Sequence, residues 1–116
     1  MHPRLIVMSQ STAESYEPTG TEICISITNP NAPLAQLSPR FAACLRLCFS
    51  DARPDDQALF GVVFDAAHAI AIRDFVAQWP LAERIVVHCK AGNGRSPGVA
   101  LGLCDLHGWP TEQLES

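Results

Sequence analysis

One short segment near the end of the chain carries residue types suited to nucleophilic chemistry on an anion. Cys89 follows an apolar run, and Arg95 lies six residues later, with Gly92 and Gly94 between them. When such a loop opens a helix, several backbone N–H groups point into one concavity and the helix dipole adds positive potential there. This field holds a tetrahedral oxyanion and favours the thiolate of a cysteine at the base of the loop. The segment therefore predicts a nucleophilic Cys89 in an anion-binding loop.

Arg95 stands at the far end of this loop, where its planar guanidinium can bind two oxygens of one phosphoryl group. A lysine could not make this bidentate contact. The same residues also have a plainer interpretation, in which Cys89 is a packing cysteine and Arg95 a surface charge, while Ser96 and Pro97 cap a helix start. Both interpretations predict a helix directly after the loop.

Alternating strands and helices are expected to position the loop. Apolar runs and strict alternation predict strands over Arg4–Ser9, Glu22–Thr28, 44–50 and 84–88. A capping box at Ser11 and Glu14, the helical spacing over about 59–78 and that over 96–107 predict helices. This order predicts a three-layer α/β fold, with a central, mostly parallel sheet of four to five strands flanked by helices and joined by right-handed crossovers.

Apolar spacing also predicts which positions of the two longer helices face the core. In the helix over 59–78 these are Ala69, Ile72, Val76 and Trp79, and in the helix over 96–107 they are Val99, Leu103 and Leu106, with Ala100 and Cys104 beside them. His68 and His107 are interpreted as packed or exposed helix residues.

Length and composition limit the class of protein. The chain has 116 residues, which is the size of one domain, and its 47% apolar and 17% charged residues exclude a disordered chain and a coiled coil. A net charge of −4 predicts no general attraction to nucleic acid or to an anionic membrane. The longest early apolar run is too short for a signal peptide, and nothing is long enough to span a bilayer. We therefore expect a cytoplasmic protein.

The five cysteines are expected to be free thiols. They are odd in number and come with no secretion signal or CxxC pair, which disfavours a disulfide framework. Zinc binding by Cys44, Cys48 and the histidines is disfavoured because the two cysteines lie in an alternating stretch typical of a strand. No metal ion and no other cofactor is expected.

The segment His88-Cys89, followed by five residues and then Arg95-Ser96, resembles the signature of the cysteine-dependent protein tyrosine phosphatase superfamily. The residues 87–92 are most similar to the corresponding segment of the compact dual-specificity-like branch, which includes small bacterial proteins. The upstream run 45–51, the intervening helix and the strand before Cys89 follow the order of that family. The resemblance implies a protein tyrosine phosphatase-like fold and a single phosphatase-like domain over 1–116.

The resemblance also implies a role for each residue of the loop. Cys89 becomes phosphorylated, Arg95 binds the phosphate, Ser96 donates a hydrogen bond that stabilises the thiolate as leaving group, and His88 orders the loop. The other substrate-binding residues are Lys90, Ala91, Gly92, Asn93 and Gly94. Family members continue with one or two more helices than this sequence contains. The expectation is therefore either a minimal variant that lacks the family's last helices, or a chain whose last helix pairs its apolar face with a second copy.

The family also requires an aspartate that donates a proton to the leaving oxygen and then activates water. Asp51 is the preferred candidate because it directly follows a strand and lies 38 residues before Cys89. Asp55 and Asp56 are alternatives in the same loop.

These features predict a phosphomonoester hydrolase acting on phosphotyrosine or on mixed phosphoprotein substrates, or on a small phosphomonoester. An inositol-lipid phosphatase is less favoured, because those enzymes usually carry a second lysine where this chain has Asn93. Two alternatives from other classes are a catalytically inactive phosphate-binding module and another thiolate enzyme, such as an arsenate reductase.

Overall fold

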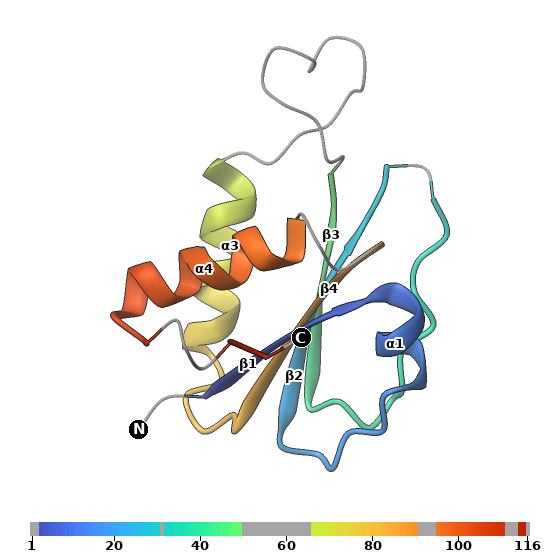
Figure 1. The fold of residues 1–116 in the computed structure, drawn as a ribbon, viewed down its shortest axis with the longest axis horizontal. Coiled ribbons are helices and arrows are strands. Elements are labelled where there is room, and N and C mark those ends of the chain that lie inside the picture. Colours follow the sequence, from blue (N-terminus) through green and yellow to red (C-terminus); the bar gives the residue numbers. More distant parts are fainter. Residues whose placement is uncertain (1–2, 31, 50–65, 91–94, 111–113, 116) are drawn as a thin grey trace, which may run out of the picture.

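A computed structural model describes residues 3–30, 32–49, 66–90, 95–110 and 114–115 (Figure 1). The elements in chain order are β1 (Arg4–Ser9), α1 (Gln10–Ser15), β2 (Glu22–Thr28), β3 (Ala43–Cys48), α3 (Ala66–Ala77), β4 (Arg84–Cys89), α4 (Arg95–His107) and β5 (Leu114–Glu115). The strands form one sheet in the order β3-β2-β4-β1-β5, and every described pairing is parallel. The predicted α/β fold with a parallel sheet is confirmed.

Four of the five described strands occur where the apolar patterns predict them, whereas β5 was not predicted. β1 and β2 have the predicted bounds, whereas β3 begins at Ala43 and ends at Cys48, just before the predicted end. All seven residues of β2 are buried, although its sequence alternates in polarity. The strand is internal to the sheet, and each of its faces contributes to a hydrophobic cluster, Ile25 to one and Cys24 to the other.

Two hydrophobic clusters lie on the two faces of the sheet. One cluster combines alternate strand residues such as Ile25 and Val87 with Ile72 of α3 and Leu103 of α4. The other combines Cys24 and Val86 with Ala13 of α1. Successive residues of a strand point to opposite faces, so α3 and α4 cover one face and α1 covers the other (Figure 1).

The predicted core face of α3 is partly wrong. Ile72 and Val76 are buried as predicted, together with Phe75, but Ala69 is exposed. Trp79 lies beyond the end of the helix and is 37% exposed. The helix ends at Ala77, shortly before Pro80. The proline ring makes helical dihedral angles unfavourable for the residue directly before it, so helices usually end at or before that residue. The earlier part of the predicted helix, 59–65, lies outside the described residues.

The predicted core face of α4 is wrong at Leu106. Val99, Ala100, Leu103 and Cys104 are buried against the sheet, but Leu106 is 57% exposed. The buried stripe is centred between Ala100 and Leu103, so Leu106 falls at its margin in the last turn. α4 ends at His107, and the next residue, Gly108, has a φ of 68°, the left-handed conformation that allows Trp109 N–H to donate to Cys104 O at 2.9 Å.

The cap of α1 also differs from the expectation. Its N-cap is Ser9 rather than Ser11, and the Ser9 hydroxyl accepts a hydrogen bond from Thr12 N–H at 3.3 Å. Ser9 is the last residue of β1 and has an extended backbone, which is the conformation that a capping residue requires. The helix therefore begins directly at the end of the strand.

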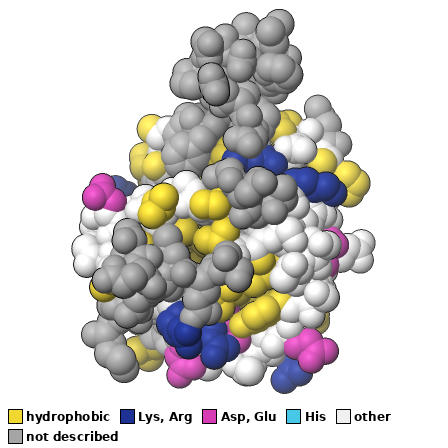
Figure 2. Space-filling model, viewed as in Figure 1, with side chains coloured by type: hydrophobic (Ala, Val, Ile, Leu, Met, Phe, Trp, Pro, Cys, Tyr) yellow, Lys and Arg dark blue, Asp and Glu magenta, His cyan; other side chains and the backbone are white. Residues whose placement is uncertain are grey.

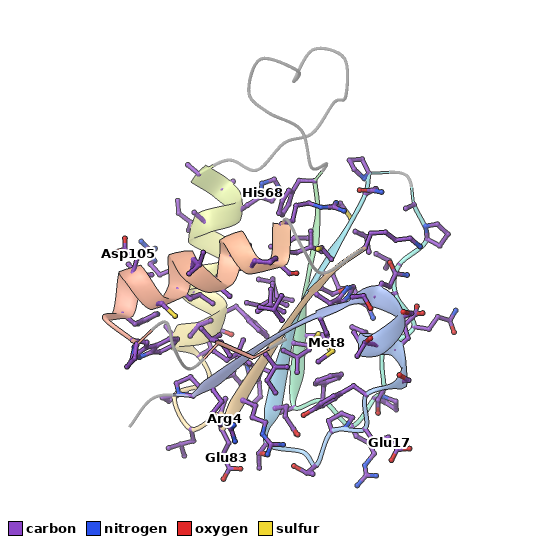
Figure 3. All side chains as sticks on the ribbon, in the orientation of Figure 1. Arg4, Met8, Glu17, His68, Glu83 and Asp105 are labelled. Carbon is purple, nitrogen blue, oxygen red and sulfur yellow. The ribbon has the colours of Figure 1, made fainter. Side chains whose placement is uncertain are left out.

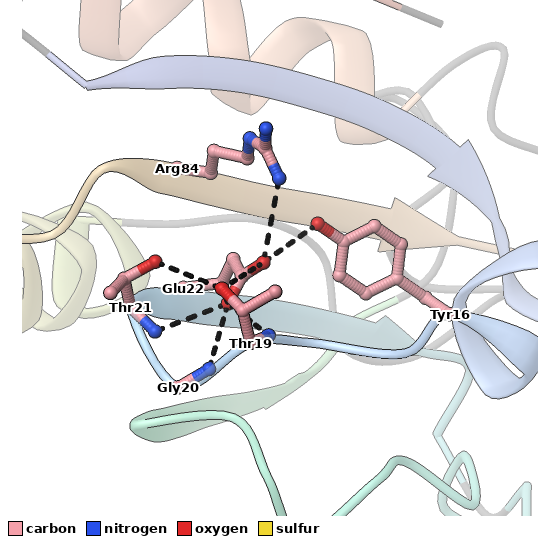
Figure 4. Close-up of polar contacts among 6 residues, drawn as sticks. All are labelled: Tyr16, Thr19, Gly20, Thr21, Glu22 and Arg84. Carbon is pink, nitrogen blue, oxygen red and sulfur yellow. Dashed lines mark hydrogen bonds and ion pairs between the residues drawn. The ribbon is translucent and has the colours of Figure 1, made fainter.

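A buried carboxylate secures the opposite end of the sheet (Figure 4). Glu22, the first residue of β2, is fully buried and accepts hydrogen bonds from Thr19 N–H at 2.8 Å and from the Tyr16 hydroxyl at 3.0 Å. Gly20 N–H also donates to it, from a backbone with a φ of 102°. An Arg84 guanidinium nitrogen lies 3.6 Å from the same carboxylate. This network ties the turn before β2 to β4.

Hydrophobic side chains also reach the surface, as the face shown in Figure 2 illustrates. Among the described residues, the large exposed ones are Leu34, Ile70, Trp79, Leu81, Leu101 and Leu106. The apolar stripe of α4 is covered by the sheet within the chain, and the large hydrophobic residues of that helix that are exposed are Leu101 and Leu106. Pairing with a second copy stays a prediction. None of the described helices has the length and hydropathy needed to cross a membrane.

Candidate active site

The carboxyl ends of the parallel strands bring the candidate residues to one edge of the sheet. β1 and β4 are neighbours, with Ser9 opposite Cys89, and Gln10 N–H donates to Lys90 O at 3.2 Å. The chain leaves β1 toward α1 on one face and leaves β4 toward α4 on the other (Figure 1). A pair of neighbouring strands with this divergence forms a topological switch point, where open α/β sheets bind their ligands.

Cys89 is the last residue of β4, and its sulfur points toward the first turn of α4. Its Sγ lies 3.2 Å from the Oγ of Ser96, which is fully buried. Cys89 itself is 2% exposed and shares its sheet face with Ile85 and Val87. The thiol therefore lies at the boundary between the apolar core and the strand-to-helix junction, with a hydroxyl donor within reach of the sulfur.

Arg95 is the first residue of α4, and its guanidinium reaches across the ends of the two neighbouring strands. Its Nη1 donates to Asn29 Oδ1 at 2.6 Å and to the Phe49 carbonyl at 2.9 Å. Asn29 directly follows β2, and Phe49 directly follows β3. Both bonds use one terminal nitrogen, so Nε and the other terminal nitrogen keep the parallel donor geometry with which arginine binds a phosphate.

His88 is a fully buried support beneath this junction. Its Nδ1 lies 3.3 Å from Cys89 O, and its Nε2 lies 2.6 Å from Ser26 Oγ in β2. A carbonyl can only accept, so Nδ1 carries the proton and Nε2 accepts from the Ser26 hydroxyl. Burial lowers the pKa of His88, and the bond to Cys89 O only partly opposes this shift. A neutral imidazole therefore links the backbone of Cys89 to the central strand.

The remaining predicted site residues divide into two groups. Lys90 is described and is exposed at the end of β4. Four loop residues, Ala91, Gly92, Asn93 and Gly94, lie outside the described residues, as do the candidate acids Asp51, Asp55 and Asp56. The structure therefore brings Cys89, Arg95, Ser96 and His88 together.

Other polar and aromatic residues have packing roles. His68 lies on the side of α3 that faces β3 (Figure 3), with its ring 5.0 Å from the ring of Phe49. His107 stacks on Trp109 at 4.3 Å. Both histidines are helix residues, as predicted, and each packs on an aromatic side chain. In the part of the chain that is described, no group of three His, Cys, Asp or Glu side chains is placed to hold a metal ion.

Sequence reasoning missed two residues that support the site, Ser26 and Asn29. Ser26 is a polar residue inside a buried strand, and Asn29 comes directly after that strand at the edge where α/β proteins bind ligands. Those two signals were available in the sequence. The Phe49 carbonyl had no such signal, because every residue carries a backbone carbonyl.

Comparison with known proteins gives no relative from which a function could be transferred. No protein-family model matches the chain, and neither a curated protein nor a solved structure does. What the site does is therefore inferred from its own residues.

Proposed function

We propose that this protein is a cysteine-dependent phosphomonoester hydrolase that works through a phosphocysteine intermediate, as in the compact dual-specificity-like branch of the protein tyrosine phosphatase superfamily. The observation that carries the proposal is the 3.2 Å approach of Ser96 Oγ to Cys89 Sγ at the strand-to-helix junction that Arg95 opens. The thiol proposed as nucleophile, a hydroxyl able to donate to it and the arginine proposed to bind the anion thus belong to one strand-to-helix junction.

In the first step, the Cys89 thiolate attacks phosphorus in line with the leaving oxygen. The S–P bond forms, the P–O bond breaks, and the leaving alkoxide or phenoxide takes a proton from a general acid. Asp51 is the proposed acid, and Asp55 and Asp56 are the alternatives. Protonation matters because an unprotonated alkoxide is a poor leaving group.

Arg95 stabilises the charge that spreads over the phosphoryl oxygens in this step. The bonds from its Nη1 to Asn29 and Phe49 hold the guanidinium in position before the substrate arrives. Donors oriented in advance need no reorganisation when charge develops in the transition state. The arginine therefore contributes both to phosphate binding and to the rate of phosphoryl transfer.

In the second step, water attacks the phosphocysteine. The conjugate base of the acid takes a proton from the water, the P–S bond breaks, and the thiolate of Cys89 leaves together with inorganic phosphate. The hydroxyl of Ser96 donates to the sulfur as negative charge returns to it, which is the role its 3.2 Å distance favours.

The proposed substrates are phosphotyrosine or mixed phosphoproteins in the cytoplasm, with small aryl phosphates as convenient surrogates. An inositol lipid is less favoured, because the loop offers Lys90 but has Asn93 in place of a second lysine. The net charge of −4 also disfavours binding of a multiply phosphorylated lipid headgroup, which is itself strongly negative.

The test is hydrolysis of para-nitrophenyl phosphate by the wild type and two cysteine variants. Cys89→Ser should abolish turnover, because the serine hydroxyl is not ionised at neutral pH. Cys104→Ser is the matched control, since Cys104 is also 2% exposed and belongs to the same hydrophobic cluster. The control variant should keep wild-type turnover, and vanadate should inhibit both the wild type and the control.

Other outcomes would identify the alternatives. Phosphate or vanadate binding without any turnover by the wild type would indicate a phosphate-binding module. Equal activity of the wild type and Cys89→Ser would remove the proposed nucleophile. Asp51→Asn should release one burst of nitrophenol followed by slow turnover, and full activity of that variant would transfer the acid role to another aspartate.

A further inference from the structure

A pair of thiols lies on the face of the sheet opposite to the proposed nucleophile Cys89. Cys24 of β2 and Cys44 of β3 are direct partners in the strand register. Register partners on neighbouring strands project to the same face. Cys24 is fully buried in the cluster that contains Val86 and Ala13 of α1, whereas Cys44 is exposed. The Cys44 thiol is therefore accessible to solvent, whereas the Cys24 thiol next to it is buried.

The spacing of the pair suits a covalent bond between the two sulfurs. Neighbouring strands run about 4.8 Å apart, and disulfides join residues whose Cα atoms are about 4.4–6.8 Å apart. The register that makes Cys24 and Cys44 direct partners therefore places their side chains side by side on one sheet face.

Exposure and the neighbouring thiol together make Cys44 the nucleophilic member of the pair. The adjacent Cys24 thiol, acting as a donor, lowers the pKa of Cys44 to about 7, with a further contribution from the charge of Arg46 and opposition from burial. The neighbouring Cys44 and burial raise the pKa of Cys24. Arg46 lies two residues after Cys44 on the same exposed strand face, and its Nη1 donates to Ala35 O at 2.9 Å.

We propose that Cys44 is a reversible oxidation site and that Cys24 is its resolving thiol. A hydroperoxide such as hydrogen peroxide is the oxidant. The Cys44 thiolate attacks one peroxide oxygen, the O–O bond breaks, and with one proton taken up the products are a sulfenic acid and water. The Cys24 sulfur then attacks the Cys44 sulfur, giving a disulfide and a second water, and a thiol reductant restores both thiols.

Cys48 is a matched internal control for this site. It lies on β3 four residues after Cys44, on the same exposed face, but its register partner is Thr28 rather than a cysteine. Its Sγ lies 3.4 Å from the Thr28 hydroxyl. Any behaviour that follows from strand position and exposure alone should therefore appear at both cysteines, whereas disulfide formation should appear only at Cys44.

The experiment treats the full chain with hydrogen peroxide and maps the cysteines by mass spectrometry. It uses a Cys89→Ser background, so that oxidation of the proposed nucleophile does not contribute. We expect a peptide pair linked through Cys24 and Cys44, with Cys48 still open to alkylation. Before oxidation, iodoacetamide at pH 7 should modify Cys44 about threefold faster than an ordinary cysteine, because its larger thiolate fraction outweighs its lower intrinsic nucleophilicity.

Two substitutions at Cys24 separate its two roles. Cys24→Ser keeps a hydrogen-bond donor but no second sulfur, so fast alkylation should persist while oxidation stops at a sulfenic acid that dimedone traps. Cys24→Ala removes the donor as well, so alkylation of Cys44 should slow about threefold. A linked pair that includes Cys48, or equal oxidation of Cys44 and Cys48 with no disulfide, would overturn the proposal. Neither result bears on catalysis by Cys89.

Discussion

The hydroxyl oxygen of Ser96 lies 3.2 Å from the sulfur of Cys89, across the junction between β4 and α4. Both residues are buried, and they approach because the helix begins only six residues after the strand ends. A hydroxyl in this position stabilises a charged sulfur more than a neutral one. Its effect should therefore appear in the step that releases the thiolate.

Replacing Ser96 with alanine should slow hydrolysis of the phosphocysteine. A hydrogen bond to a charged group contributes about 1.5–3 kcal/mol, which corresponds to a fall of about 10- to 100-fold in steady turnover of para-nitrophenyl phosphate. The burst of nitrophenol should remain, because formation of the intermediate does not expel the thiolate. Rapid-quench kinetics would measure both phases. Ser15→Ala, at an exposed helix position, is the control, and loss of the burst in Ser96→Ala would contradict the assignment.

Replacing Arg95 with lysine should impair both binding and turnover. Lysine keeps the charge but lacks the planar guanidinium, which bonds to Asn29 and Phe49 O and leaves further nitrogens for the phosphate. Loss of one oriented donor to a transition state costs about 10²–10³-fold in kcat. Arg73→Lys is the matched control, because Arg73 is an exposed helix residue paired with Asp74. Equal kcat/KM for the two variants would show that Arg95 is a surface charge.

Replacing Ser26 with alanine should destabilise the protein by about 1–3 kcal/mol, because Nε2 of the buried His88 would lose its hydrogen-bond donor. Urea unfolding would measure the change, and Ser11→Ala, at an exposed position, should leave the free energy of unfolding nearly unchanged. An unfolding midpoint for Ser26→Ala equal to that of the wild type would argue against the bond. A decrease in kcat beyond the loss of folded protein would show that the His88 support also positions Cys89.

The carboxylate of Glu22 should make stability depend on pH in the acid range. Burial acts to raise the pKa of Glu22, but hydrogen bonds from Thr19 and Tyr16 outweigh it, so the pKa lies below the ordinary value. A carboxyl with a lowered folded pKa stabilises the protein fully above its unfolded pKa of about 4.3, and this contribution is lost as the pH falls through the folded value.

Glu22→Gln tests this dependence. It should cost about 1.5–3 kcal/mol at pH 7, because hydrogen bonds to a charged acceptor become bonds to a neutral one. The difference in the free energy of unfolding between variant and wild type should shrink below pH ~4.3, as Glu22 itself becomes protonated. Urea unfolding at several pH values would measure it. Glu17→Gln is the exposed control, and a difference that stays constant down to pH ~3 would assign the effect to shape rather than charge.

Much of the local structure could be predicted from the sequence. The bounds of β1 and β2, and the placement of Cys89 and Arg95 at a strand-to-helix junction, follow from hydrophobic periodicity and from the helix start at Ser96 and Pro97. These signals depend on residues within one or two turns of each other. The prediction that Leu106 faces the core was wrong, because this residue lies at the margin of the buried stripe of α4.

The sequence by itself determined the bounds of β1 and β2, the approximate positions of β3 and β4, and the strand-to-helix junction at which the proposed nucleophile lies. Only the tertiary structure decided that Ser26 supports His88, that Arg95 bonds to Asn29 and Phe49, and that Cys24 lies opposite Cys44. Those contacts depend on strand order and register, which join residues 20 to 66 positions apart. Register is set by how whole faces pack together, and no short stretch of sequence contains that information.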